Sequence, residues 1–218
     1  MANIKGVLFD LDGTILDTAD DLGAALNHVL AQYNLPSVPA EKYRPIASDG
    51  AKGLLTLGFG SKLDTFDFEQ LREQFLTFYD NNIAAYTQLY SGMSELLKHL
   101  DQHHIVWGII TNKPEGLSKK LIPHYPELNT SKILIGGDSL SERKPHPLPL
   151  TYALEKLQLT STECFYVGDA PRDIEAGRRA NMPTIIAGWG YISDLGDTAS
   201  WQADHLCHNP EEIVALLK

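Results

Sequence analysis

The sequence predicts an α/β fold in which a doubly wound parallel sheet carries an inserted helical domain. Short apolar runs alternate with amphipathic stretches over most of the chain, in the regular order of strand and helix. The apolar runs are nearly continuous, as in strands that are covered on both faces. One long segment after the first run shows helical patterns and no convincing strand. A chain of 218 residues, 43% of them hydrophobic, can build a core of this kind.

Strands and helices are predicted in regular order over most of the chain. The predicted strands are Gly6–Phe9, Ile105–Thr111, Lys132–Gly137, Cys164–Gly168 and Pro183–Gly188, with a weaker one at His205–Cys207. The predicted helices are Met93–Gln102, Pro114–Ile122, Leu148–Leu157, Arg172–Ala180 and Pro210–Leu217. The last helix has Asn209 as its N-cap, proline in the first helical position and Glu212 three residues after the cap.

The exception to this alternation is the segment from Thr18 to about Ala85. Apolar residues recur at helical spacing in two stretches of it, which are Leu22, Leu26, Val29, Leu30 and Tyr33, and Phe68, Leu71, Phe75, Phe78 and Tyr79. We therefore assign residues 1–16 and 86–218 to an α/β core domain and residues 17–85 to a helical cap domain. Open α/β sheets bind ligands at the carboxyl ends of their strands, so an insertion after the first strand is a candidate lid.

Composition excludes several classes of function. The net charge is -10, and no run of Lys and Arg is available to follow a phosphate backbone, so we expect no nucleic-acid partner. No apolar run is long enough for a signal peptide or a membrane span, which predicts a cytoplasmic protein without a membrane partner. The two cysteines, Cys164 and Cys207, have no metal-binding spacing. Monomer and homodimer are equally compatible with the sequence.

Polar residues follow four of the predicted strands at the point where each strand ends. Asp10 and Asp12 follow the first, and Thr111 and Asn112 the second. Beyond the third lies Lys144, and the fourth is followed by Asp169 and Asp173. The carboxyl ends of parallel strands share one edge of a sheet, so we expect these side chains to converge there.

The converging residue types favour a site for a cation and an anion together. Mg²⁺ prefers oxygen ligands, and Asp10, Asp12 and Asp169 are the candidates. The Asp12 side chain could instead be left free, with its backbone carbonyl on the metal. Lys144 adds positive charge, and Thr111 and Asn112 offer hydrogen-bond donors to an oxyanion. The simplest anion for such a site is a small phosphorylated metabolite.

The two acids after the first strand can divide the chemistry of phosphate-ester hydrolysis. Asp10 is the better nucleophile, because a carboxylate can attack phosphorus without first losing a proton. Asp12 would protonate the leaving alcohol and later deprotonate the attacking water. Lys144 and Mg²⁺ would neutralise charge on the transferred group.

Four motifs carry a resemblance to a known family. "DLDGT", "IITNKP", "RKPHPLP" and "GDAPRDIEAG" resemble, in order and spacing, the motifs of haloacid dehalogenase-superfamily phosphatases, and the helical insertion looks like their cap. Within them the chain is most similar to the phosphoglycolate phosphatase group, through "TNKP" and "GGDSLSERKPHPLPL". The resemblance implies a Rossmann-like core, Mg²⁺ as cofactor and an aspartyl-phosphate intermediate.

The same resemblance implies a role for each motif residue. It makes Asp10 the nucleophile and Asp12 the acid and base. It gives phosphate contacts to Thr111, Asn112 and Lys144, and metal ligation to Asp10, Asp12 and Asp169, with Asp173 in support. One departure is Ala170, where many members carry a hydroxyl residue.

In the predicted cap, the turn at Asp49-Gly50 leads into a helix. Lys52 follows it closely and could meet a polar or anionic group of a substrate. Arg44 is a weaker candidate of the same kind. We therefore name Asp49, Lys52 and Arg44 as candidate substrate contacts.

Several alternatives stay open at this stage. "GWGYI" and "WQAD" resemble the branch that dephosphorylates N-acetylmuramic acid 6-phosphate, so that compound or another sugar phosphate is the alternative substrate to phosphoglycolate. Trp189 and Tyr191 within the first string are interpreted as core or interface aromatics. A phosphomutase of the β-phosphoglucomutase type is disfavoured by Thr14, and a phospho-acceptor signalling module by the long helical insertion.

Overall fold

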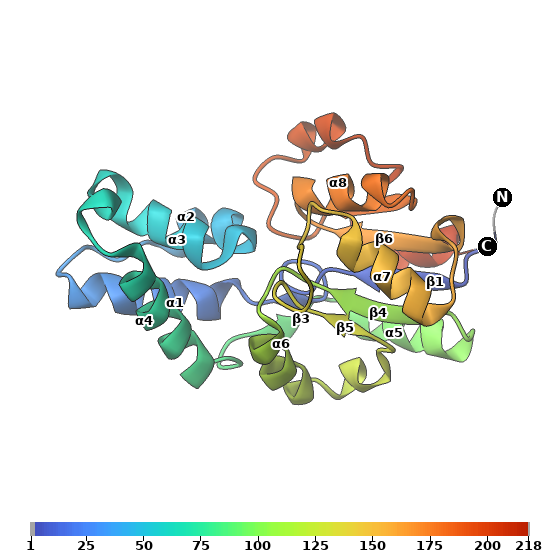
Figure 1. The fold of residues 1–218 in the computed structure, drawn as a ribbon, viewed down its shortest axis with the longest axis horizontal. Coiled ribbons are helices and arrows are strands. Elements are labelled where there is room, and N and C mark those ends of the chain that lie inside the picture. Colours follow the sequence, from blue (N-terminus) through green and yellow to red (C-terminus); the bar gives the residue numbers. More distant parts are fainter. Residues whose placement is uncertain (1–2, 218) are drawn as a thin grey trace. The chain divides into compact units, whose positions relative to one another are not determined.

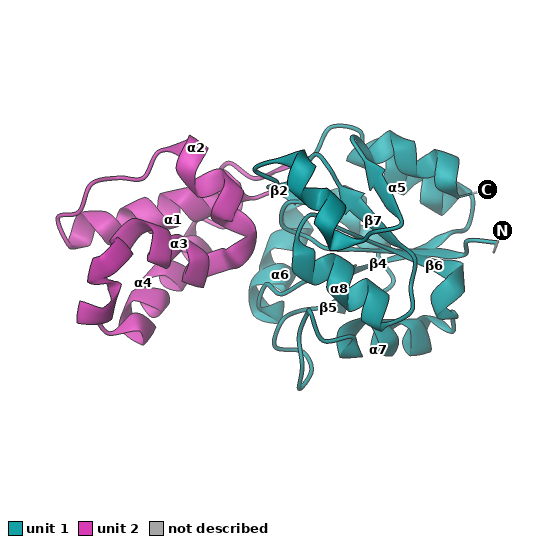
Figure 2. Cartoon of the chain, turned by 90° about the horizontal axis from the view of Figure 1, so that it is seen from above, with its two compact units in different colours: residues 1–16, 89–218 teal, residues 17–88 magenta. Residues whose placement is uncertain are grey.

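The structure of the chain is a computed structural model that describes residues 3–217. The chain divides into two compact units, residues 1–16 with 89–218, and residues 17–88. Figure 2 draws the first in teal and the second in magenta. Unit 2 extends to Gln88, three residues past the Ala85 at which the predicted cap domain ends. Two very short strands, β2 (Leu16–Asp17) and β3 (Gln88–Leu89), pair where the chain passes between the units.

Unit 1 contains a six-stranded sheet in the order β5-β4-β1-β6-β7-β8, and all its neighbouring pairs are parallel. The strands are β1 (Gly6–Phe9), β4 (Val106–Ile110), β5 (Leu134–Ile135), β6 (Cys164–Gly168), β7 (Thr184–Ala187) and β8 (His205–Cys207). Residues of β1, β6 and β7 are buried throughout. This burial explains why these strands are continuous apolar runs in the sequence.

The chain winds in both directions from the centre of this sheet. It runs outward from β1 through β4 to β5, then crosses back to β6 and continues through β7 to β8. Right-handed crossovers in opposite directions place their helices on opposite faces, and Figure 1 shows helices on both faces of the sheet. The strand order therefore reverses between β1 and β6, which is where open α/β sheets bind ligands.

Four α-helices cover the sheet, α5 (Met93–Gln102), α6 (Glu115–Leu121), α7 (Leu148–Leu157) and α8 (Pro171–Arg179). One buried cluster joins α7 and α8 to Leu8 of β1, Ile110 of β4 and Tyr166 of β6. On α5, the buried residues Met93, Leu96, Leu97 and Leu100 recur at helical spacing. Five short 3₁₀ helices complete the unit, η3 (Ile122–His124), η4 (Pro126–Thr130), η5 (Ser161–Glu163), η6 (Leu195–Trp201) and η7 (Pro210–Leu216).

The doubly wound parallel sheet is confirmed, and the bounds of α5 and α7 are those predicted. Four elements, β4, α6, α8 and β7, differ by one residue at their ends, and two differ by more. The third predicted strand is reduced to the two residues of β5, and beyond it the Gly137 N–H donates to Lys113 O, past the end of β4. The last predicted helix has its Asn209 cap but is 3₁₀, a form common in short terminal pieces.

Unit 2 is built from helices alone between its two connections to unit 1. These are α1 (Ala19–Gln32), α2 (Ala40–Tyr43), η1 (Arg44–Asp49), α3 (Gly50–Phe59), η2 (Gly60–Thr65) and α4 (Phe68–Asn81). The predicted apolar faces pack together, since Leu22, Leu26, Val29 and Leu30 of α1 and Leu71, Phe75 and Tyr79 of α4 are buried. Within residues 3–217, we find no helix with the length and apolar character needed to cross a membrane.

A buried carboxylate joins the first helix of unit 2 to the end of the unit, where the chain returns to unit 1. Asp21 of α1 is 2% exposed and accepts hydrogen bonds from the backbone N–H groups of Tyr86 and Thr87. It also accepts one from the Thr87 hydroxyl, at 2.6 Å. Asp21 therefore ties the returning chain to the first helix of the unit.

Candidate active site

Asp10 lies directly after β1, at the reversal of strand order. Its backbone N–H continues the ladder by donating to Val167 O at 2.9 Å, and its side chain is almost fully buried. The next residues form a tight turn, in which the N–H groups of Thr14, Ile15 and Leu16 all donate to Leu11 O. Gly13 has φ +84°, and a Cβ on it would lie 2.2 Å from Asp169 Oδ2. Glycine is therefore required where this turn approaches Asp169.

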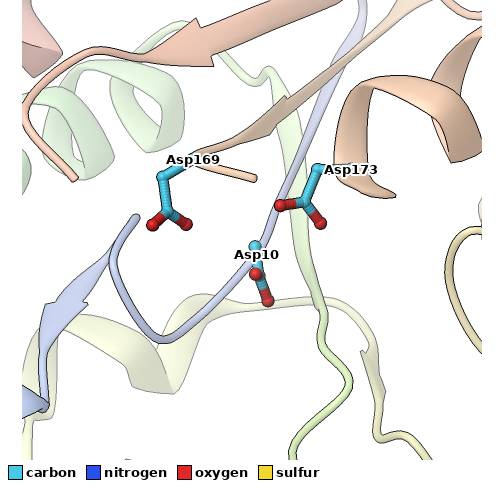
Figure 3. A group of neighbouring side chains, drawn as sticks. All are labelled: Asp10, Asp169 and Asp173. Atoms are coloured by element: carbon cyan, nitrogen blue, oxygen red, sulfur yellow. The ribbon is translucent and has the colours of Figure 1, made fainter. Parts of the chain in front are cut away.

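Three buried carboxylates meet at this edge of the sheet. Asp10, Asp169 and Asp173 are 3%, 2% and 0% exposed, and each offers an oxygen within 4.8 Å of the others. Figure 3 shows their carboxylates directed toward a common space, Asp10 from the loop after β1, Asp169 from the turn after β6 and Asp173 from α8. Among residues 3–217 this is the one group of three or more acidic, histidine or cysteine side chains with such spacing.

Lys144 supplies positive charge to this carboxylate cluster, which we define as Asp10, Asp169 and Asp173. Its ammonium lies 3.0 Å from Asp10 Oδ1 and 2.7 Å from Asp173 Oδ1, and its side chain is fully buried. Burial raises the pKa of the Asp173 carboxyl, while Lys144 acts in the opposite direction and Asp10 in the same one. The carboxylate cluster is thus costly to charge, and any further cation would stabilise it.

Tyr166 completes the surroundings of Lys144 and was not expected from the sequence. The ammonium of Lys144 donates to its hydroxyl at 2.7 Å, and the hydroxyl donates to Ile110 O at 3.0 Å. Burial raises the pKa of Tyr166 well above its ordinary value, so the phenol keeps its proton. The sequence signal that could have indicated this role is a hydroxyl-bearing aromatic residue inside the otherwise apolar run "CFYVG".

Asp12 lies outside the carboxylate cluster. Its Oδ1 lies 3.0 Å from the ammonium of Lys113, and both side chains are largely shielded, with 14% and 5% exposed. Lys113 is a further residue that the sequence analysis did not assign, although it belongs to the "TNKP" motif. The structure therefore gives the two acids of "DLDGT" different surroundings.

Thr111 and Asn112 follow β4 at the same edge of the sheet. The Thr111 hydroxyl accepts a hydrogen bond from the Lys113 N–H at 3.1 Å, and the side chain is buried. Asn112 Nδ2 donates to Lys144 O at 2.9 Å, while its buried Oδ1 has no hydrogen-bond partner among the described residues. The amide thus ties β4 to the segment that carries Lys144, and the remaining side-chain atom, Oδ1, can accept a hydrogen bond but cannot donate one.

Asp169 and Asp173 are positioned by the turn from β6 into α8. Asp173 is the third residue of α8, and its Oδ2 accepts from the Ala170 N–H at 3.0 Å. This bond caps the helix with a carboxylate, an arrangement that the positive end of the helix favours. Asp169 Oδ1 accepts from the Thr14 hydroxyl at 3.2 Å, which links β6 to the loop after β1.

The three candidate substrate contacts, Arg44, Asp49 and Lys52, all lie in unit 2. Arg44 pairs with Asp17 and, at 2.9 Å, with Asp20. Burial alone would lower the pKa of its guanidinium, but the two carboxylates hold the pKa above its ordinary value. Asp49 and Lys52 are exposed at the start of α3. All three stay predicted substrate contacts.

The chain resembles known proteins over almost its whole length. Residues 7–187 match the haloacid dehalogenase-like hydrolase family. A phosphoglycolate phosphatase of Xanthomonas campestris pv. campestris is 43% identical over 209 residues, which are 96% of this chain and 94% of the relative. An N-acetylmuramic acid 6-phosphate phosphatase of Pseudomonas aeruginosa is 35% identical over 214 residues, which are 98% of this chain and 95% of the relative.

A solved structure agrees with these relatives. The crystal structure of a predicted phosphoglycolate phosphatase from Haemophilus somnus 129pt superposes with a TM-score of 0.89 at 25% identity, and the match covers 100% of both chains. The fold, the buried carboxylates at the reversal of strand order and the family match all agree. The chain belongs to the haloacid dehalogenase-like hydrolase family.

Proposed function

We propose that the chain hydrolyses a small phosphate monoester in a Mg²⁺-dependent reaction that passes through an aspartyl-phosphate on Asp10. The observation that carries this proposal is the buried carboxylate cluster with Lys144 at the carboxyl ends of β1 and β6. The relatives named as phosphatases of phosphoglycolate and of N-acetylmuramic acid 6-phosphate support it.

The donor set of the cluster suits a hard divalent cation. Its oxygens come from three buried carboxylates that lie within 4.8 Å of one another, and Mg²⁺ prefers oxygen ligands. We assign Asp10 and Asp169 as ligands and Asp173 as a supporting residue. For Asp12 we favour the backbone carbonyl over the side chain, since its carboxylate pairs with Lys113. Bound Mg²⁺ would supply positive charge for the carboxylates and for the phosphoryl oxygens.

In the first step a carboxylate oxygen of Asp10 attacks phosphorus, and the bond from phosphorus to the ester oxygen breaks. Asp12 gives a proton to that oxygen, so the product leaves as an alcohol. In the second step Asp12 takes a proton from water, the water oxygen attacks phosphorus, and the bond to Asp10 breaks. Inorganic phosphate leaves and both acids return to their starting states.

The remaining residues bind and orient. Lys144 neutralises negative charge on the transferred group. Thr111 and the backbone N–H of Asn112 complete the phosphate site, since the Asn112 side chain donates to Lys144 O. Lys113 holds the Asp12 carboxylate in place. We propose Asp49, Lys52 and Arg44 of unit 2 as residues that select the alcohol part of the substrate.

Asp10→Asn tests the nucleophile. We expect it to abolish hydrolysis of a panel of organic-acid and sugar phosphates, because the amide is a poor nucleophile. Asp67→Asn makes the same chemical change at the N-cap of α4, where asparagine also caps well, and it should keep full activity. Undiminished hydrolysis by Asp10→Asn would refute the assignment.

Phosphoglycolate is the leading candidate substrate, because the more similar relatives are named as phosphoglycolate phosphatases. N-acetylmuramic acid 6-phosphate is the alternative, favoured by the 35% identical relative. Values of kcat/KM for the two esters, measured side by side, decide between them. Product analysis with a hexose phosphate tests for a mutase, and stable phosphorylated protein without turnover would indicate a phospho-acceptor.

A further inference from the structure

The loop that follows β7, residues 188–191, contacts the candidate active site although the sequence marked its aromatics as core or interface residues. The indole N–H of Trp189 donates to Thr14 O at 2.9 Å, across 175 positions of the chain. The backbone N–H of Tyr191 donates to Asp169 Oδ2 at 3.0 Å. The same loop thus reaches both the turn after Asp10 and the first acid after β6.

Asp169 is held from two sides as a result. Its Oδ1 accepts from the Thr14 hydroxyl and its Oδ2 from the Tyr191 N–H, and the side chain is 2% exposed. Trp189 holds the backbone of the same Thr14 whose hydroxyl reaches Asp169. Each donor therefore limits the directions in which this carboxylate can point.

The loop packs closely against the turn after Asp10 and against Asp169 at Gly190. A Cβ on Gly190 would lie 2.3 Å from Asp169 Cβ and 2.4 Å from Gly13 O. Real Cβ atoms do not approach backbone so closely, so glycine is needed here for steric reasons. The loop is also anchored at its start, since the Gly188 N–H donates to Cys207 O of β8 at 2.8 Å.

From these contacts we infer that residues 188–191 are a positioning element of the metal site and that Trp189 is its positioning residue, acting through Thr14 on the orientation of Asp169. The inference rests on the proposed function, because it takes Asp169 as a Mg²⁺ ligand. Hydrogen bonds that orient a ligating carboxylate raise metal affinity, and losing one such partner costs roughly 10- to 100-fold.

Trp189→Phe tests the inference, because it removes the indole N–H and keeps an aromatic ring. Mg²⁺ affinity is measured by isothermal titration calorimetry on the substrate-free protein, so that the readout is independent of turnover. We expect an increase in Kd of about 10-fold. The phosphate-ester KM at saturating Mg²⁺ should change little, and added Mg²⁺ should restore most of the activity.

Two further variants separate positioning from folding. Trp201→Phe makes the same change in η6, and its Mg²⁺ affinity should equal that of the wild type. Gly190→Ala places a methyl group against Asp169 and should weaken Mg²⁺ binding more than Trp189→Phe does. Circular dichroism and the melting temperature of each metal-free variant show whether it is folded.

The outcomes distinguish this inference from the function on which it rests. If the wild type binds Mg²⁺ and Trp189→Phe binds it equally well, the inference is wrong and the proposed function stands. The inference is also wrong if Trp189→Phe and Trp201→Phe weaken binding alike. A wild-type protein that binds no Mg²⁺ overturns the proposed cofactor and the inference together.

Discussion

The ammonium of Lys113 lies 3.0 Å from Asp12 Oδ1, although 101 positions separate the two residues in the chain. Lys113 follows β4 and Asp12 follows β1, and these strands are neighbours in the sheet. The pair is shielded from solvent, so it limits the rotamers of an acid that is proposed to move protons.

Lys113→Met should therefore lower kcat and leave KM nearly unchanged. A positioned acid or base contributes roughly 10²- to 10⁴-fold, and a mobile Asp12 would lose part of that factor. Steady-state kinetics with a phosphate ester measure the effect. Lys119→Met removes an exposed lysine from the neighbouring helix α6 and serves as the control. Equal kinetics for both variants would show that Lys113 does not orient Asp12.

Tyr166→Phe should destabilise the protein by about 1 kcal/mol, the net worth of a typical buried hydrogen bond. The variant keeps the ring in the core and removes the hydroxyl that accepts from Lys144. Urea unfolding at neutral pH measures the free energy of unfolding. Tyr152→Phe, at a half-buried position on α7, should change it less. A loss of similar size in both variants would contradict a specific role for the hydroxyl.

Asp21→Asn should destabilise the protein by about 2 kcal/mol, because an amide nitrogen would face the backbone donors of Tyr86 and Thr87. Urea unfolding is again the measurement. Asp64→Asn makes the same change at an exposed position of η2 and should leave stability unchanged. Wild-type stability in Asp21→Asn would mean that these hydrogen bonds contribute nothing net to folding.

Burial raises the pKa of the Cys164 thiol from its ordinary value of 9.0 to about 12. The unfolded thiol ionises first as pH rises, so its contribution to stability is complete below pH 9 and is lost progressively toward pH 12. Between pH 8 and 10.5 we expect this group to cost about 2 kcal/mol of stability. Unfolding of Cys164→Ala at both pH values should lack that loss, and an equal loss in the variant would exclude the thiol as its source.

Much of the fold could be predicted because its signals are local. The run Gly6–Phe9 is apolar throughout and lies in the middle of the sheet, and α5 and α7 have the predicted bounds. β2 and β3 have no such local signal, since each has two residues and is defined only by its pairing with the other. The end of β5 depends likewise on a contact outside the strands, the hydrogen bond from the Gly137 N–H to Lys113 O.

By itself the sequence determined the sheet, the helical insertion and the meeting of Asp10, Lys144, Asp169 and Asp173 at one sheet edge. These features follow from residue order, because parallel strands bring their carboxyl ends to the same side. Only the tertiary structure decided the partners of each acid. It placed Lys113 beside Asp12, Tyr166 beside Lys144, and Trp189 beside the turn that holds Asp169. Such contacts depend on directions and distances between side chains of different strands, which the spacing of residues along the chain does not contain.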